Sequence, residues 1–349
     1  MMKILSLLVM LFLSTVAFAK IWIVDSNPGS TAKDFTNLQA AHDGAAAGDT
    51  LYLIGSSVNY ITTKVTVTKR LVIIGPGYFL NENANTQANV ASAFLNNTSA
   101  GICEELELGL GSEGSVVMGL EIIGRVIINA NNILFKRNHI RQEAGCNETM
   151  LSINASNIMV VQNFMDGNLN SSSKSVIVVS ALQTGIMISN NYAYHSCSGC
   201  GAGVLALYSP ASSSVDVSNN IFYGGINVAN GIVQNNLFLS NTLTFISCLV
   251  RNNTSEHGMN YLPPGNGNEN NTGFNFVATG STDGKWQLAE SSPLKSSGFG
   301  GTERGLFGGT EPYILSGIPP IPTIYSFTAP VIGEKNTGLP IQLKVKSNN

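Results

Sequence analysis

A short phrase recurs six times in the middle of the chain: an alternating apolar stretch that ends in Asn and is followed by apolar residues. The six phrases are ILFKRNHI from Ile133, IMVVQNFM from Ile158, IMISNNYA from Ile186, VDVSNNIF from Val215, GIVQNNLF from Gly231 and CLVRNNTS from Cys248. The positions three and five residues before the shared Asn are mostly apolar, which is the period-two pattern of a strand with one buried face. Because such a unit cannot bury that face alone, it must stack on its neighbours, and the repeat predicts a β solenoid.

The shared Asn residues follow one another at intervals of 25, 28, 29, 16 and 17 residues. Only one short strand and one corner recur, which indicates a parallel β-helix whose loops differ in length from coil to coil. Helical repeats would not tolerate this density of Asn and Gly. The corner Asn tolerates left-handed backbone angles, and amides stacked in successive coils can hydrogen-bond to one another. We therefore predict a structural Asn ladder made of Asn138, Asn163, Asn191, Asn220, Asn236 and Asn253.

Residues 1–19 have the features of a secretory signal peptide. Lys3 precedes an uncharged apolar run from Ile4 to Phe18, and the small-residue ending predicts cleavage after Ala19. The run is too short for a membrane span, and no other stretch is apolar enough to cross a bilayer. The sequence therefore predicts a mature protein in the periplasm, at the cell surface or outside the cell.

Composition excludes some partners. Charged residues make up 11% of the chain and the net charge is −3, so no basic surface exists to hold nucleic acid or an acidic membrane. The scarcity of Lys and Arg also argues against a polyanionic substrate. Five Cys are present. Cys197 and Cys200 fit either a local disulfide or plain buried thiols, and Cys248 occupies an inward-facing position as a small apolar residue. A redox-active or metal-binding pair is the further alternative, although no second Cys pair completes a metal site.

The amino-terminal region contains a strand at Ile21 to Val24, an amphipathic helix from about Phe35 to Ala46 and a Gly48-Asp49 turn, followed by strands at Leu51 to Ile54 and Leu71 to Ile74. This order resembles the amino-terminal cap of secreted right-handed parallel β-helix proteins of the pectate-lyase-like superfamily. VVMGLEIIG from Val116 resembles their next coil, and the Leu-x-x-x-Ser-Pro phrase in QLAESSPL resembles their closing segment.

The resemblance implies an all-β, right-handed parallel β-helix of the kind found in uncharacterised bacterial members of that superfamily. We expect a signal peptide at 1–19, a β-helix domain with a short capping helix at 20–311, and an extended carboxy-terminal tail at 312–349. The closing segment departs from the resemblance, because Glu303-Arg304-Gly305 stands where an Asp-Ile-Gly-like strand is typical. One fold carries many functions, so the resemblance by itself assigns no activity.

The catalytic motifs of related enzymes do not occur in this sequence. A calcium-dependent pectate lyase needs a cluster of Asp and Glu for the metal and a nearby Arg or Lys as base. The acidic residues of the coil region are scattered, so no cofactor is predicted. Calcium is the alternative, and it would need a carboxylate cluster assembled by the loops. A polygalacturonase-like hydrolase would contain Asn-Thr-Asp, Asp-Asp and Gly-His-Gly phrases, and none is present.

The repeat register still indicates where a site would lie. Three residues past each ladder Asn, the column contains Arg141, Asp166, Tyr194, Tyr223, Leu239 and Glu256. If the coils stack about 4.8 Å apart, these residues form a polar and aromatic strip. Tyr faces beside hydrogen-bonding groups suit a sugar chain, so Tyr194 and Tyr223 are the candidate substrate-binding residues. The alternative interpretation is an ordinary solvated face.

Arg141, Asp166 and His195 are the candidate catalytic residues. Asp166 together with Arg141 or Glu143 is the nearest approach to a catalytic pair, and His195 or His257 could serve as a base beside a carboxylate. Each His also fits a plain loop residue. His139 stands where the other phrases have mainly apolar residues, which favours a packing role.

The position four residues before each ladder Asn should face outward, yet it is mostly apolar: Leu134, Met159, Met187, Asp216, Ile232 and Leu249. An exposed apolar stripe is an aggregation hazard or a docking surface, so we expect a covering segment. The candidate is the tail at 312–349, which would pack back on the solenoid or close its last coil. A sorting or surface-attachment role is the other interpretation of the tail.

The sequence thus supports two functions from different classes. The first is a secreted β-helix protein that binds polysaccharide or modifies it, as a polysaccharide lyase or glycoside hydrolase. The second is a non-catalytic structural or adhesive cell-surface protein, in which the solenoid is a rigid spacer. The oligomeric state is left open by the sequence.

Overall fold

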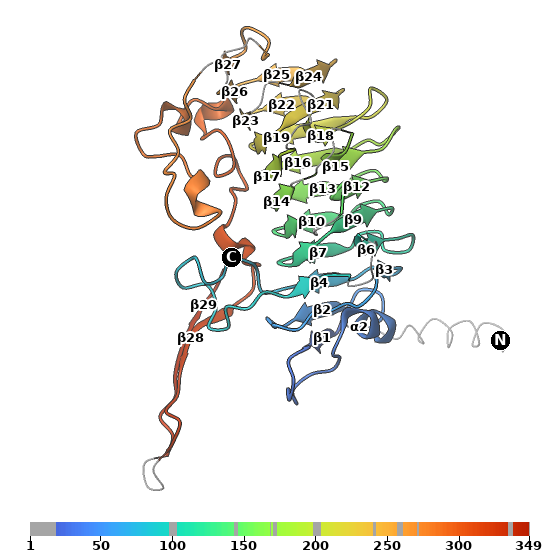
Figure 1. The fold of residues 1–349 in the computed structure, drawn as a ribbon, viewed down its shortest axis with the longest axis vertical. Coiled ribbons are helices and arrows are strands. Elements are labelled where there is room, and N and C mark those ends of the chain that lie inside the picture. Colours follow the sequence, from blue (N-terminus) through green and yellow to red (C-terminus); the bar gives the residue numbers. More distant parts are fainter. Residues whose placement is uncertain are drawn as a thin grey trace, which may run out of the picture.

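Three long parallel sheets form the sides of a solenoid in the computed structural model (Figure 1). The structure describes residues 19–97, 103–142, 146–167, 169, 173–197, 204–239, 242–256, 261–270, 272–333 and 338–348. Most turns of the chain contribute one strand to each sheet, and strands one coil apart pair in parallel. Crossovers between parallel strands of one sheet are right-handed. The predicted right-handed parallel β-helix is confirmed.

Sheet A has ten strands, in this order along the solenoid: β1 (Ile21–Val24), β2 (Thr50–Leu53), β4 (Val72–Ile74), β7 (Val116–Met118), β10 (Leu134–Lys136), β13 (Met159–Val161), β16 (Ile186–Ser189), β19 (Val215–Ser218), β22 (Ile232–Gln234) and β25 (Leu249–Arg251). Sheet B has eight strands: β3 (Val65–Val67), β6 (Glu104–Leu108), β9 (Arg125–Ile128), β12 (Leu151–Ile153), β15 (Ser175–Val179), β18 (Leu205–Tyr208), β21 (Gly225–Ala229) and β24 (Leu243–Ile246). Sheet C has nine: β5 (Phe94–Leu95), β8 (Glu121–Ile123), β11 (His139–Arg141), β14 (Phe164–Gly167), β17 (Tyr192–His195), β20 (Ile221–Tyr223), β23 (Leu237–Phe238), β26 (Thr254–Ser255) and β27 (Glu269–Asn270).

Inward-facing apolar side chains of all three sheets form one continuous core. In sheet A, the position three residues before each ladder Asn supplies one buried row: Phe135, Val160, Ile188, Val217, Val233 and Val250. These residues are register partners in neighbouring strands, as the sequence alignment requires. The alternation of buried and outward residues therefore fixes which side chains fill the solenoid.

A hydrogen-bonded ladder of Asn side chains runs along the turn between sheets A and C. Each amide Nδ2 donates to the Oδ1 of the next Asn at 2.9–3.2 Å, from Asn138 through Asn163, Asn191, Asn220, Asn236 and Asn253 to Asn268. The same Oδ1 atoms accept the backbone N–H of the preceding ladder Asn at 2.9–3.1 Å. The ladder thus satisfies buried backbone and amide groups together.

The left-handed backbone of this turn belongs to the residue before each ladder Asn, which corrects the expectation that the Asn itself adopts it. Positive φ angles of 50° to 58° occur at Arg137, Gln162, Asn190, Asn219, Asn235 and Asn252. This residue lies at the corner between a sheet A strand and a sheet C strand, and its side chain contacts the return segment described below.

The amino-terminal end is capped by the helix α2 (Leu38–Gly44), which is shorter than the predicted helix. The Asn37 side chain accepts the N–H of Ala40 and caps its start. Asp49 follows the helix and accepts three hydrogen bonds, from the backbone N–H groups of Lys20 and Ala46 and from the Trp22 indole, at 2.7–2.9 Å. The Gly48-Asp49 turn therefore fastens the first strand to the cap.

The chain turns back after β27, and residues 272–318, called here the return segment, run beside the solenoid toward its amino-terminal half (Figure 1). This segment contains four short 3-10 turns: η1 (Gly284–Trp286), η2 (Pro293–Lys295), η3 (Phe299–Gly301) and η4 (Leu315–Gly317). Its apolar residues cover a row of sheet C side chains, in a second cluster that includes Phe164, Tyr192, Leu288 and Leu306.

The side chains at the left-handed turn positions hold the return segment in place. Asn252 donates to Ser297 O, Asn219 to Glu303 O, Asn190 to Leu306 O and Gly308 O, Gln162 to Pro312 O, and Arg137 to Ile318 O, at 2.5–3.1 Å. These coils thus bind carbonyl groups along one antiparallel segment, and in the coil between them the Asn235 side chain accepts the N–H of Phe299 at 2.7 Å. Arg304, only 2% exposed, adds hydrogen bonds back to Asn253 O, Thr254 Oγ1 and Gly267 O in the last coils.

The tail differs from expectation in what it covers. The return segment begins at Thr272 rather than Pro312, and it lies on sheet C and the adjoining turn. Of the tail, residues 312–318 join this packing, whereas β28 (Thr323–Thr328) and β29 (Gln342–Lys346) form an antiparallel hairpin that projects away from the solenoid (Figure 1). The apolar stripe of sheet A remains uncovered, with Met159, Met187 and Leu249 between 38% and 46% exposed. The expectation that the tail covers the stripe within one chain is wrong.

Candidate functional site

The outer face of sheet C carries two columns of side chains, one covered by other parts of the chain and one open. In the first, the register neighbours are His139, Phe164, Tyr192, Ile221 and Leu237. They are buried under the return segment and the rings of Tyr78 and Phe79. In the second, two residues further along each strand, Arg141, Asp166, Tyr194 and Tyr223 are register neighbours. We call this second set the sheet C strip. It borders the return segment without lying beneath it, which makes it the candidate functional surface.

An aromatic pair forms the centre of the sheet C strip. The rings of Tyr194 and Tyr223 lie 4.7 Å apart between centroids at 39°, and Tyr223 is 40% exposed. Tyr194 also stacks on the buried ring of Tyr192 at 6.5 Å and 6°. Tyr192 in turn contacts Trp286 of the return segment at 4.7 Å. The rings of Tyr194 and Tyr223 therefore pack on buried aromatic side chains and are not isolated on the surface.

Charged groups lie at one end of the strip. The Arg141 Nε donates to Glu121 Oε1 at 3.0 Å, and Ser92 Oγ donates to the other Glu121 oxygen at 2.6 Å. Asp166 is the register neighbour of Arg141, but the ion pair of Arg141 is with Glu121. Arg141 is consequently a partly neutralised cation, 44% exposed at its side chain.

The environment favours protonation of Asp166. Its side chain is exposed, yet the neighbouring protein partly desolvates the carboxyl group and raises its pKa above the usual value. The ammonium of Lys285, in the return segment, opposes this shift. A carboxyl group with a raised pKa can donate a hydrogen bond to a hydroxyl-rich ligand, or a proton to a leaving group.

His195 lies apart from the other two catalytic candidates. It follows Tyr194 on β17, so its side chain points to the opposite, inner face of sheet C and is 2% exposed. Its Nε2 lies 3.2 Å from Leu169 O, and burial lowers the pKa of its imidazole. The structure therefore brings Arg141 and Asp166 together on one surface and separates His195 from both.

Two further residues considered from the sequence, Glu143 and His257, lie outside the described residues. His139 is buried among the rings of Tyr78, Phe79 and Phe164, with centroid distances of 4.7–5.9 Å. This burial lowers its pKa to about 4, so the imidazole is neutral at physiological pH.

Sequence reasoning missed Glu121, Lys285 and Trp286. Glu121 belongs to a coil in which Leu120 replaces the ladder Asn, so an alignment anchored on Asn passes over it. The alternation of Leu120, Glu121 and Ile122 still indicates that Glu121 faces outward. Lys285 and Trp286 reach the strip only because the return segment folds back, and no local signal indicates that.

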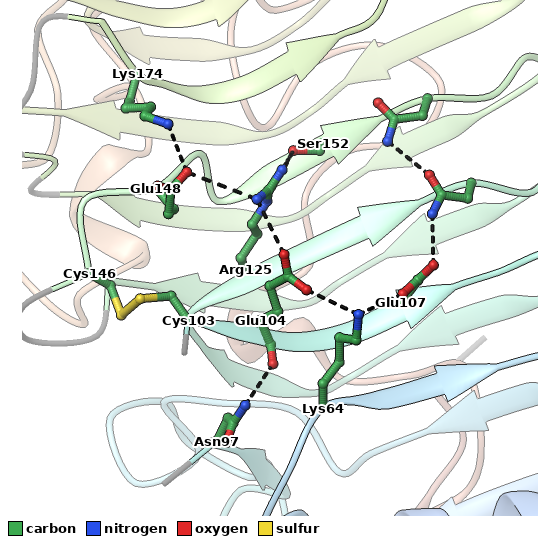
Figure 2. Close-up of polar contacts among 12 residues, drawn as sticks. Lys64, Asn97, Cys103, Glu104, Glu107, Arg125, Cys146, Glu148, Ser152 and Lys174 are labelled. Carbon is green, nitrogen blue, oxygen red and sulfur yellow. Dashed lines mark hydrogen bonds and ion pairs between the residues drawn. A yellow bond between two sulfur atoms is a disulfide. The ribbon is translucent and has the colours of Figure 1, made fainter. Parts of the chain in front are cut away.

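A second polar cluster, on the outer face of sheet B, consists of ion pairs (Figure 2). Lys64 pairs with Glu104 and Glu107, Arg125 with Glu104, and Lys174 with Glu148, at 2.8–3.5 Å. A disulfide between Cys103 and Cys146, unforeseen from the sequence, lies at its edge. Because acids and bases alternate and are partly exposed, the charges neutralise one another, and each pair contributes little to stability.

The remaining cysteines differ in state. Cys197 is also disulfide-bonded, whereas Cys200 lies outside the described residues. Cys248 is a free, half-buried thiol packed against the core. Within the described part of the chain, no group of three or more His, Cys, Asp or Glu residues could hold a metal ion.

Two cavities lie away from the sheet C strip. One of about 540 Å³ opens at the last coils, lined by Phe245, Cys248, Val250 and Leu262 among others. The other, of about 510 Å³, lies between the return segment and the base of the hairpin, lined by residues that include Asn83, Tyr313 and Lys346. Among the described residues, no helix is long and apolar enough to span a membrane.

The three stacked parallel sheets define a right-handed parallel β-helix protein. No protein-family model and no curated protein matches the chain. The crystal structure of pectate lyase Pel9A is similar at 13% sequence identity and a TM-score of 0.40, over 82% of this chain and 93% of that one. The fold assignment rests on the strand pairing itself.

Proposed function

We propose that this chain is a secreted β-helix protein that binds polysaccharide along the sheet C strip. The observation that carries the proposal is the pair of supported, outward-facing rings of Tyr194 and Tyr223 beside Asp166. Sugar rings offer apolar faces for stacking and hydroxyl groups for hydrogen bonds, and the strip offers a partner for each.

The charges favour a neutral or weakly charged glycan. Arg141 is paired with Glu121, and Lys285 lies near Asp166, so cations and carboxylates offset each other along the strip. A polyanion would need an excess of unpaired Arg or Lys, which the composition does not supply.

Secretion is part of the proposal. The apolar run that follows Lys3 supports it, and so does the disulfide between Cys103 and Cys146, because disulfides persist in oxidising compartments outside the cytoplasm.

Bond cleavage is the stronger form of this proposal, with Asp166 as acid and Arg141 as the group that orients or polarises the substrate. Glycoside hydrolysis normally uses two carboxyl groups across the bond to be broken. Among the described residues, Glu121 is the second carboxylate that approaches the strip, and its oxygens are engaged by Arg141 and Ser92. Binding without cleavage therefore fits the geometry better.

The test measures binding of purified residues 20–349 to a panel of plant, algal and bacterial polysaccharides, with assays for reducing ends and unsaturated products on the same samples. The key variant is Tyr194→Ala/Tyr223→Ala, and the matched control is Tyr208→Ala, since Tyr208 on β18 is 38% exposed on another sheet. We expect the double variant to weaken binding at least tenfold and the control to leave it unchanged. Equal effects of both variants would refute the strip as the binding surface.

Product release would establish an enzyme, and loss of product with retained binding in Asp166→Asn would assign the acid. Failure to bind any polysaccharide would favour the second candidate, a structural or adhesive cell-surface protein. The observation that favours this second candidate is the uncovered apolar stripe of sheet A, which glycan binding alone does not require.

A further inference from the structure

The carboxy-terminal hairpin has one wholly apolar face. In its register, Ile324 lies opposite Val345, and Phe327 lies opposite Leu343. Opposite residues of an antiparallel pair share a face, so these four side chains, called here the hairpin face, project together. All four are 45–63% exposed. The other face pairs Thr323 with Lys346, Ser326 with Lys344 and Thr328 with Gln342.

Among the described residues, the hydrogen bonds between the hairpin and the body of the protein lie near the hairpin's base. Ala88 N donates to Ile324 O at 2.8 Å, and Thr323, which is buried, contacts Thr86 O. Beyond this point the two strands project from the solenoid (Figure 1). A two-stranded hairpin is marginally stable in water unless its apolar face packs on something. The hairpin face therefore lacks the packing partner that would stabilise the hairpin.

Sheet A presents the complementary surface. The outward column that starts at Ile21 passes through register partners in all ten strands: Ile21, Thr50, Val72, Val116, Leu134, Met159, Met187, Asp216, Ile232 and Leu249. We call this row the sheet A column. Eight of the ten are apolar, and those from Met159 onward are 36–46% exposed apart from the exposed Asp216. Neither unpartnered apolar surface covers the other within one chain.

We propose that the hairpin of one copy of this chain packs on the sheet A column of a second copy. The two surfaces match in length. Five strands from β13 to β25 at a spacing of about 4.8 Å span roughly 19 Å, and a six-residue strand such as β28 also spans roughly 20 Å.

The charges also match. The hairpin's described residues carry Lys344 and Lys346 and no carboxylate, and both Lys lie on the polar face, away from the contact. The one charged residue of the sheet A column is Asp216. The contact therefore places no like charges against each other, and the two surfaces carry charges of opposite sign.

This contact joins two different surfaces, so each copy keeps one free hairpin and one free column. Such a head-to-tail interface continues into a chain of copies unless its rotation closes a ring. The proposal does not depend on glycan binding, since sheets A and C face different sides of the solenoid.

The experiment measures the mass of residues 20–349 against concentration by analytical ultracentrifugation. Phe327→Lys/Leu343→Lys disables the hairpin face, and Met187→Lys/Ile232→Lys disables the sheet A column. Ser326→Lys/Thr328→Lys adds the same charge to the polar face and is the control. All these side chains lie on outer surfaces, and circular dichroism melting curves check that each variant is folded.

We expect the wild type and the control to associate, and each disabled variant alone to weaken association at least tenfold. A mixture of the two disabled variants should form a one-to-one dimer, because one intact hairpin and one intact column remain. A column variant that still associates like the wild type would overturn the proposal in favour of hairpin-to-hairpin pairing. A wild type that stays monomeric at millimolar concentration would overturn it as well.

Discussion

Removal of one amide from the middle of the Asn ladder tests whether the ladder holds the solenoid together. Asn191 is fully buried, and its side chain makes five hydrogen bonds: it donates to Val160 O, Ser189 O and Asn220 Oδ1, and accepts from Asn163 N and Asn163 Nδ2. In Asn191→Ala the backbone N–H of Asn163 loses its partner in a site that water does not reach.

The magnitude follows from these contacts. One orphaned buried N–H costs about 1–3 kcal/mol, and the four other bonds contribute about 0.5 kcal/mol each because their remaining groups keep second partners. The sum is about 3–5 kcal/mol of unfolding free energy. The matched variant is Asn268→Ala at the open end of the ladder, where water can replace the half-buried amide and the loss should be about 1 kcal/mol.

Urea unfolding of both variants gives the two losses, and hydrogen exchange of the amides in β16 and β17 locates them. Exchange is needed because a solenoid can open locally, and a single transition need not describe it. We expect Asn191→Ala to speed exchange in the coils on either side of β16. Equal losses in the two variants, within about 0.5 kcal/mol, would refute the ladder as an energetic element and leave it a packing pattern.

Three other perturbations test separate parts of the molecule. The pKa of His139 is lowered to about 4 from the ordinary 6.5, so the unfolded chain binds an extra proton between these values and acid conditions destabilise the fold. We expect the unfolding free energy to have its full value above pH 6.5 and to fall by about 3 kcal/mol as the pH drops to 4. His139→Phe should remove this pH dependence, and an NMR titration midpoint near 6.5 for the His139 imidazole would contradict the prediction. Asp49→Ala should lower the unfolding free energy by about 2–3 kcal/mol and expose Trp22, which tryptophan fluorescence detects. An unchanged unfolding midpoint would show that the cap does not need these hydrogen bonds. Arg304→Ala should release the return segment, detected as faster proteolysis of residues 272–318, and intact resistance would argue against its anchoring role.

Much of the solenoid could be predicted because its determinants are local. The alternation around Asn138 specifies a strand and its inner face, and stacking of identical amides fixes the register between coils. The same alignment placed Arg141, Asp166, Tyr194 and Tyr223 in one column, and the strand register matches it.

The rest depends on contacts between residues far apart in the sequence. Which sheet C column is covered is decided by the return segment, where Trp286 meets Tyr192 across a long separation. The disulfide joins Cys103 to Cys146 over 43 residues, and no spacing rule points to that pairing. The interior position of His195 was within reach of the period-two rule, since a residue next to the outward Tyr194 must face inward.

The turn between sheets A and C explains why one outer column is covered and the next stays open. The residue before each ladder Asn adopts a left-handed backbone, so its side chain leaves the ladder and points outward. Arg137, Gln162 and Asn190 differ in size but all donate hydrogen bonds, and each binds a carbonyl group of the return segment. Asn235, at the same position of another coil, instead accepts the N–H of Phe299 at 2.7 Å. A side chain that hydrogen-bonds is therefore what this position requires, and the residue identity can vary. The sheet C strip lies beyond the reach of these donors, so the return segment leaves one side of its Tyr and Asp side chains uncovered. A column that the return segment leaves open, and whose aromatic rings rest on buried neighbours, is where a binding function can be placed.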